Sequence, residues 1–144
     1  MVTAATLTLA FGVGAVLALM VGMFAHAVGY DRDGAFYATV LTVVGSLYVL
    51  FAIMAGAGQA IALEIAFFGV FAAIAAIGFR SSHWIIVAGL ALHGVFDFVR
   101  HSFVAARGAP EWWPAFCGSY DLVAALYLAM LLLIRRRRTD SLWP

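Results

Sequence analysis

The stretch Leu92–His101, LHGVFDFVRH, places four ionisable side chains, His93, Asp97, Arg100 and His101, among residues that are otherwise apolar. A charged side chain that faces lipid near the centre of a bilayer costs at least ~2.5–3.5 kcal/mol. His93, Asp97 and His101 follow one another at a spacing of i, i+4 and i+8, so a helix presents all three on one face. We expect this face, which we call the stripe, to point into a bundle of helices.

The composition of the chain indicates that this bundle lies in a membrane. Of its 144 residues, 66% are hydrophobic and 10% are charged, and the mean hydropathy is +1.06. A chain of this composition is far more apolar than an ordinary soluble domain. The single Cys117 excludes an internal disulfide and any metal motif with several cysteines. We expect the lipid bilayer, and no nucleic acid, as its partner.

Apolar runs between polar breaks predict an all-α integral membrane protein with about five transmembrane helices. The breaks are YDRDG at 30–34, GAGQ at 56–59, RSSH at 80–83 and RGAPEWWP at 107–114. The helices are expected at about 4–28, 36–55, 60–79, 84–105 and 115–134. The short connections should make neighbouring helices antiparallel. Residues 1–144 are therefore predicted to form a single transmembrane helical bundle with several passes.

The arginines predict the orientation of this bundle. Arg32, Arg80 and the run 135–138 fall on the side of the C-terminus, whereas Arg100 and Arg107 fall on the other side. Cytoplasmic segments of membrane proteins carry an excess of basic residues. We therefore expect the C-terminus in the cytoplasm and the N-terminus outside the cell membrane.

On this topology, polar groups of other helices lie at the depth of the stripe, in the outer half of the membrane. Glu64 is about one turn into its helix, and Asp121 is one to two turns into the last helix. We expect both to meet the stripe, because an unpaired buried carboxylate is costly. The candidate metal ligands are His93, Asp97, His101, Glu64 and Asp121, and the surrounding polar network includes Arg100, Ser46 and Tyr120.

Three functions are open for this polar cluster. As a metal site it would bind Zn, Mn or Fe, or a polar group of a ligand, and the protein could then be a lipid-directed hydrolase or oxidase. As a proton or ion relay it would belong to a small transporter that works as a homo-oligomer. As a salt-bridge network around Arg100 it would hold together a structural or accessory subunit of a larger membrane complex. Enzymatic activity is left open, since no HExxH-like signature is present.

Three further residues carry simpler expectations. Asp31 and Asp33 should sit in water or cap the following helix. Cys117 should be a small packing residue.

The last third of the chain resembles a small multi-pass membrane family of unknown function. The resemblance lies in His93-Gly94-x-Phe96-Asp97-x3-His101 followed by Trp113-Pro114-x2-Cys117-x3-Asp121, within about residues 89–130. It implies that these His and Asp elements belong together. A second likeness is to the membrane-embedded ceramidase-like hydrolases, which hold a metal with three His and an Asp beside a Ser. This chain departs from them, because it has fewer spans and no His-x3-His pair.

Overall fold

The computed structural model describes residues 2–100 and 108–140, leaving aside the side chains of 138–140. The chain forms five helices in these residues, namely α1 (Ala4–Val28), α2 (Ala35–Met54), α3 (Gly58–Arg80), α4 (His83–Val99) and α5 (Trp113–Asp140). Within this part of the chain, four helices are long and apolar enough to cross a membrane, and the shorter one is α4. The prediction of an all-helical chain with apolar, membrane-compatible helices is confirmed.

The helix limits follow the apolar runs closely except in the last two helices. Helix α1 has its predicted limits, and α2 and α3 lie within two residues of theirs. Helix α4 is described as 17 residues, which at 1.5 Å each gives about 25 Å against a hydrocarbon core of about 30 Å. Its predicted end at 105 lies outside the described residues. Helix α5 continues to Asp140 rather than ending at 134, because the arginines after residue 134 are good helix formers. Five membrane crossings therefore stay a prediction.

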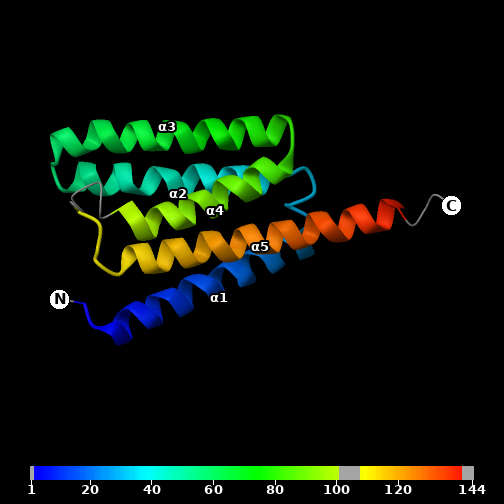
Figure 1. Ribbon diagram of the computed structural model, residues 1–144, viewed down its shortest axis with the longest axis horizontal. Coiled ribbons are helices and arrows are strands. Elements are labelled where there is room, and N and C mark those ends of the chain that lie inside the picture. The colour runs from blue at the N-terminus through cyan, green and yellow to red at the C-terminus, as the bar shows by residue number, and fades with distance from the viewer. Residues whose placement is uncertain (1, 101–107, 141–144) are drawn as a thin grey trace.

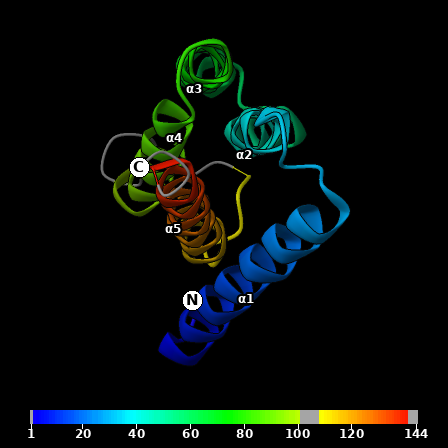
Figure 2. The same cartoon turned by 90° about the vertical axis from the view of Figure 1, so that its right-hand side faces the viewer.

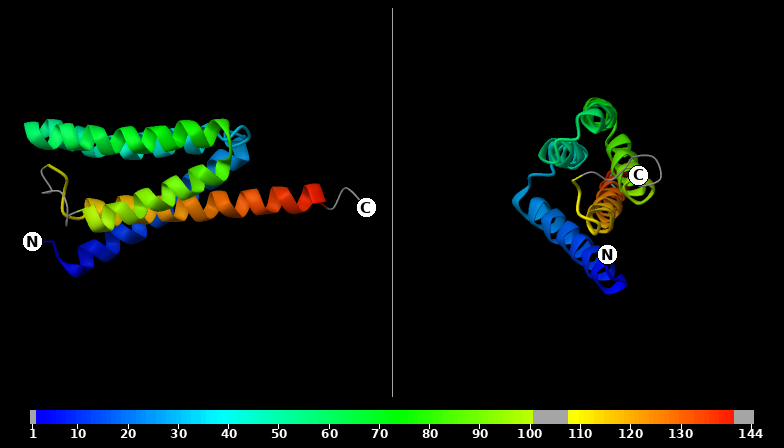
Figure 3. Two further views of the ribbon diagram at one scale, coloured as in Figure 1. Left: turned by 45° about the horizontal axis from the view of Figure 1, so that its top comes forward. Right: turned by 90° about the vertical axis from the view of Figure 1, so that its left-hand side faces the viewer.

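The five helices run up and down, so that α1 starts at one end of the bundle and α5 finishes at the other (Figure 1). Helix α5 packs on α1 and on α4, while α4 also packs on α3 and α2. Seen end-on, α1 and α3 lie on opposite sides of this arrangement (Figure 2). Helices α4 and α5 lie alongside each other and run in opposite directions (Figure 3). This central antiparallel pair carries the polar residues discussed below.

Small residues on α1 allow α5 to approach this helix closely. On α1, Gly14 faces the backbone carbonyl of Phe116 and the hydroxyl of Ser119, and Gly14, Ala18 and Gly22 are all buried. Ser119 also donates a hydrogen bond of 2.8 Å to the carbonyl of Phe11. Small residues let backbones approach in this way in membrane helices. The small residues of α1 therefore form its contact with α5.

The loop between α1 and α2 folds back onto the ends of two helices. Asp31 is buried, in contrast to the expectation that it would sit in water. Its carboxylate lies 2.8 Å from Nδ1 of His26 and 3.3 Å from the guanidinium of Arg135 on α5. Asp33 behaves as expected, since Oδ1 accepts a hydrogen bond of 3.0 Å from the N–H of Ala35 at the start of α2. These contacts tie the α1–α2 loop to the far end of α5.

We predict that Gly14→Ala destabilises the protein and that Gly12→Ala does not. A Cβ at Gly14 would overlap the Phe116 carbonyl, whereas nothing lies within 4 Å of a Cβ at Gly12 on the same helix. Overpacking of this kind typically costs about 1–3 kcal/mol, and alanine in place of glycine otherwise favours a helix. The unfolding midpoints of both variants are measured by thermal unfolding in detergent. Equal unfolding midpoints would show that α1 and α5 do not pack as described.

Candidate metal centre

Two pairs of side chains converge between α4 and α5. His93 and Asp97 are spaced i, i+4 on α4, and Cys117 and Asp121 have the same spacing on α5. All four residues are buried, and each offers one potential ligand atom, with these atoms all within 4.8 Å of one another. We call these four residues the metal-ligand cluster. The expected contact between Asp121 and the stripe is thus confirmed for the described residues, at His93.

The antiparallel course of the two helices explains which residues of the cluster meet. His93 lies opposite Asp121, with Nδ1 of the imidazole 2.7 Å from Oδ2 of the carboxylate. The same nitrogen lies 3.7 Å from Oδ2 of Asp97. The thiol of Cys117 donates to Oδ2 of Asp121 over 3.8 Å. One imidazole and one thiol therefore face two carboxyl groups across the helix interface.

The two helices use the same local sequence pattern at this point. His93-Gly94-x-Phe96-Asp97 on α4 corresponds to Cys117-Gly118-x-Tyr120-Asp121 on α5. A Cβ at Gly94 would lie 2.9 Å from the carbonyl oxygen of Gly118, and a Cβ at Gly118 would lie 2.9 Å from that of Gly94. Each glycine follows a potential ligand residue and allows the facing backbone to approach. The pattern is therefore the local reason that the four side chains meet.

The carboxyl groups of the cluster have hydrogen-bonding capacity to spare. Among the described residues, both oxygens of Asp97 and Oδ1 of Asp121 are buried without a hydrogen-bond partner. The buried hydroxyl of Tyr48 has no hydrogen-bond partner in this part of the chain either, but it lies beside Asp97, to which its O–H can donate. Buried polar atoms normally have a hydrogen-bond partner, and burying one without a partner costs free energy. A bound cation or additional protons would supply what these oxygens lack.

Aromatic side chains enclose the imidazole of the cluster. The ring of Phe71 on α3 meets the ring of His93 edge-on, with centroids 4.6 Å apart, and the centroid of the Phe96 ring lies 6.3 Å from that of His93. Phe71 also contacts Phe96, and Phe96 contacts Phe67. This apolar cover keeps the environment of the imidazole of low polarity, where interactions between charges are strong.

Glu64 does not join the cluster, in contrast to the expectation that it would be a metal ligand. Its carboxylate forms a buried ion pair with the guanidinium of Arg100. That guanidinium also lies over the ring of Tyr48, with its central carbon 4.0 Å from the ring centroid. Among the described residues, neither Asp97 nor Asp121 forms an ion pair with Arg100. The predicted depth of Glu64 in the membrane suggested that it is a metal ligand. Glu64 instead lies on the face of α3 that meets Arg100.

The remaining predicted site residues have other positions. His101 lies outside the described residues. Ser46 donates a hydrogen bond of 2.7 Å to the carbonyl of Val43 in its own helix. Tyr120 and Cys117 line an apolar cavity of about 350 Å³ between α1, α2 and α5. Cys117 was expected to be a packing residue, and its spacing from Asp121, which repeats that of His93 and Asp97, is the signal that marks it as a potential ligand.

No model of a protein family, no curated protein and no solved structure matches this chain. Its function is therefore argued from its own residues and their geometry.

We predict that Glu64→Gln strongly destabilises the protein, because it leaves the buried guanidinium of Arg100 without its anion. Breaking one partner of a buried ion pair typically costs about 3–5 kcal/mol. The double variant Glu64→Gln/Arg100→Gln should recover part of this loss. Chemical unfolding in detergent gives the free energy of unfolding of the wild type, the single variant and the double variant. Glu111→Gln is the control, since Glu111 is exposed, and surface changes usually stay within about 0.5 kcal/mol. A Glu64→Gln variant as stable as the control would contradict the ion pair.

Proposed function

We propose that this membrane protein binds one divalent transition metal ion, Zn²⁺, at the metal-ligand cluster between α4 and α5. The observation that carries the proposal is the convergence of two i, i+4 pairs, with four potential ligand atoms within 4.8 Å of one another. Helix-borne carboxylate and imidazole ligands that project into a bundle core are an established way to build a metal centre. Ionisable groups inside a membrane are also functional more often than not.

The set of donor atoms favours zinc. An imidazole nitrogen, a thiolate sulfur and two carboxylate oxygens are all ligands that Zn²⁺ accepts, and four of them complete a tetrahedron. Mg²⁺ and Ca²⁺ prefer oxygen ligands, so a thiolate and an imidazole argue against them. Bonds of about 2.0–2.3 Å place tetrahedral ligand atoms roughly 3.3–3.8 Å apart. The 2.7 Å between His93 and Asp121 would then widen by about 1 Å or less, which side-chain rotation can provide.

The charge of the site supports the same conclusion. Two carboxylates and a thiolate buried together repel one another, and burial of each anion is costly. A divalent cation offsets most of this charge and bonds to the oxygens that have no partner among the described residues. Binding releases the proton between His93 and Asp121 and that of the Cys117 thiol, so affinity should fall as the pH is lowered.

The placement of this centre in the cell is part of the proposal. The arginine bias supports a C-terminus in the cytoplasm and a cluster in the outer half of the cell membrane. The Arg100–Glu64 pair supports a structural network beside the centre rather than a second function, because each charge already has its partner.

The test is the metal content of the protein purified in a mild detergent without chelators. We expect about one zinc per chain by plasma mass spectrometry, and loss of zinc in Asp97→Asn and Asp121→Asn. Asp31→Asn is the matched control, because Asp31 is also a buried aspartate but lies in the α1–α2 loop. It should retain its zinc.

Unfolding measurements separate loss of metal from loss of fold. A ligand that binds the native state raises its stability, so a chelator should lower the unfolding midpoint of the wild type but not that of Asp97→Asn. Wild-type protein that stays free of transition metal even after incubation with zinc would refute the proposal. Equal loss of zinc from Asp31→Asn and Asp97→Asn would refute it as well.

A further inference from the structure

The hydroxyl of Tyr48 lies next to the metal-ligand cluster, although Tyr48 is not one of its four residues. Tyr48 is a buried residue of α2, and its hydroxyl has no hydrogen-bond partner among the described residues. Because α2 packs on α4, this hydroxyl lies beside the carboxylate of Asp97. A buried tyrosine hydroxyl usually has a hydrogen-bond partner. An O–H donor without a partner and a carboxylate without a partner thus face each other between two helices.

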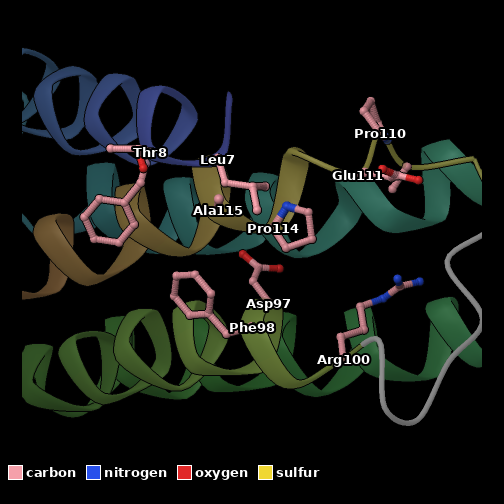
Figure 4. Close-up of a pocket in the computed structure, with 11 residues that line it drawn as sticks. Leu7, Thr8, Asp97, Phe98, Arg100, Pro110, Glu111, Pro114 and Ala115 are labelled. Atoms are coloured by element: carbon pink, nitrogen blue, oxygen red, sulfur yellow. The ribbon is translucent and has the colours of Figure 1, made fainter. Parts of the chain in front are cut away.

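Asp97 finds its partners inside the bundle. The residue lies at the wall of a cavity of about 760 Å³ between α1, α4 and the segment that leads into α5 (Figure 4). It is nevertheless 0% exposed, so a molecule in this cavity does not contact its oxygens. Figure 4 shows the carboxylate directed from α4 towards the start of α5. A hydrogen bond to Asp97 therefore comes from a side chain that is packed against it.

A tetrahedral zinc site uses one of the two oxygens of Asp97. The four residues of the cluster complete the tetrahedron with one atom each. His93 and Cys117, which also lie near the Asp97 carboxylate, would then bind the ion instead of donating to Asp97. The second oxygen of Asp97 would stay buried without a donor from the cluster, which costs free energy. Tyr48 is the described residue beside this carboxylate that keeps an O–H to donate.

The ring of Tyr48 is held in place by a charged neighbour. The guanidinium of Arg100 lies over this ring, with its central carbon 4.0 Å from the ring centroid. The buried ion pair with Glu64 fixes the guanidinium in turn. A cation over an aromatic face is attracted to it, and its positive charge favours negative charge on the hydroxyl oxygen, which makes the O–H a stronger donor. The ion pair and the metal-ligand cluster therefore have Tyr48 as a common neighbour.

We propose that Tyr48 is a positioning residue of the metal centre, and that its hydroxyl donates to the Asp97 oxygen that does not bind the ion. This hydrogen bond keeps Asp97 a ligand through one oxygen and so keeps the coordination number at four. Hydrogen bonds to ligand groups orient them in metal sites, and their loss typically costs about 10–100-fold in metal affinity. The inference rests on the proposed function and adds a residue of α2 that raises the affinity of the site for zinc.

The test compares the zinc affinities of Tyr48→Phe and Tyr37→Phe, measured in detergent by competition with a fluorescent zinc chelator. Tyr48→Phe removes the hydroxyl and leaves the ring beneath Arg100. Tyr37 is the matched control, because it is also a buried tyrosine of α2 whose hydroxyl has no partner among the described residues. It lies roughly 16 Å along the helix from Tyr48, beside Gly22 of α1. We expect Tyr48→Phe to bind zinc about 10–100-fold more weakly than the wild type and Tyr37→Phe to keep the wild-type affinity.

Two further measurements separate positioning from packing. Zinc should raise the unfolding midpoint of Tyr48→Phe less than that of the wild type, because a weaker ligand stabilises less, whereas the two midpoints in excess chelator should be similar. Co²⁺ bound in place of zinc reports the coordination number, since tetrahedral Co²⁺ absorbs visible light more strongly than five- or six-coordinate Co²⁺. We expect weaker absorption in Tyr48→Phe, where Asp97 is free to bind through both oxygens, and wild-type absorption in Tyr37→Phe.

Four results would overturn the inference. These are full zinc affinity in Tyr48→Phe, an equal loss of affinity in both variants, a cobalt spectrum that Tyr48→Phe leaves unchanged, and a Tyr48→Phe variant that is destabilised as much without metal as with it. The zinc content of the wild type is measured on the same preparation. Wild-type protein that binds zinc no more tightly than Tyr48→Phe defeats this inference alone, whereas wild-type protein that cannot be loaded with zinc defeats the proposed function.

Discussion

The close approach of α4 and α5 at Gly94 and Gly118 is the contact on which the metal-ligand cluster depends. Each glycine leaves room for the backbone carbonyl of the other helix, and any side chain there would push the helices apart. Because the helices are antiparallel and both carry the i, i+4 pattern, this single contact sets His93 opposite Asp121 and brings Asp97 and Cys117 into the same space. Helices α1, α2 and α3 pack around this pair.

Two groups of buried charges lie near each other and meet different demands. Arg100 and Glu64 neutralise each other and join α3 to the end of α4, although Nε of the guanidinium is buried without a hydrogen-bond partner among the described residues. The metal-ligand cluster holds two carboxyl groups, a thiol and an imidazole, and keeps oxygens without partners among the described residues. A low-polarity environment makes such an imbalance expensive. This difference is the physical reason for assigning a structural role to one group and a ligand-binding role to the other.

The helices and part of the site could be predicted from the sequence. Apolar runs and polar breaks locate the helices, because both are local properties of the chain. The cost of burying an unpaired charge predicts that Asp121 meets the stripe, as it does at His93. Glu64 pairs with Arg100 rather than joining the cluster, because depth in the membrane alone does not tell which neighbour a helix face meets. Cys117 packs in the hydrophobic core as expected, and its spacing from Asp121 is the pattern that also makes it a potential ligand. The buried position of Asp31 depends on a loop folding back on Arg135, which no local pattern reports.

X-ray absorption at the zinc edge tests most directly whether His93, Asp97, Cys117 and Asp121 hold one ion. For the zinc-loaded wild type, four bound side chains predict one sulfur at about 2.3 Å and three nitrogen or oxygen atoms at about 2.0–2.2 Å. The sulfur contribution should disappear in Cys117→Ser while the lighter atoms remain. A spectrum without sulfur in the wild type, or one with six oxygen neighbours typical of loosely held zinc, would contradict the account.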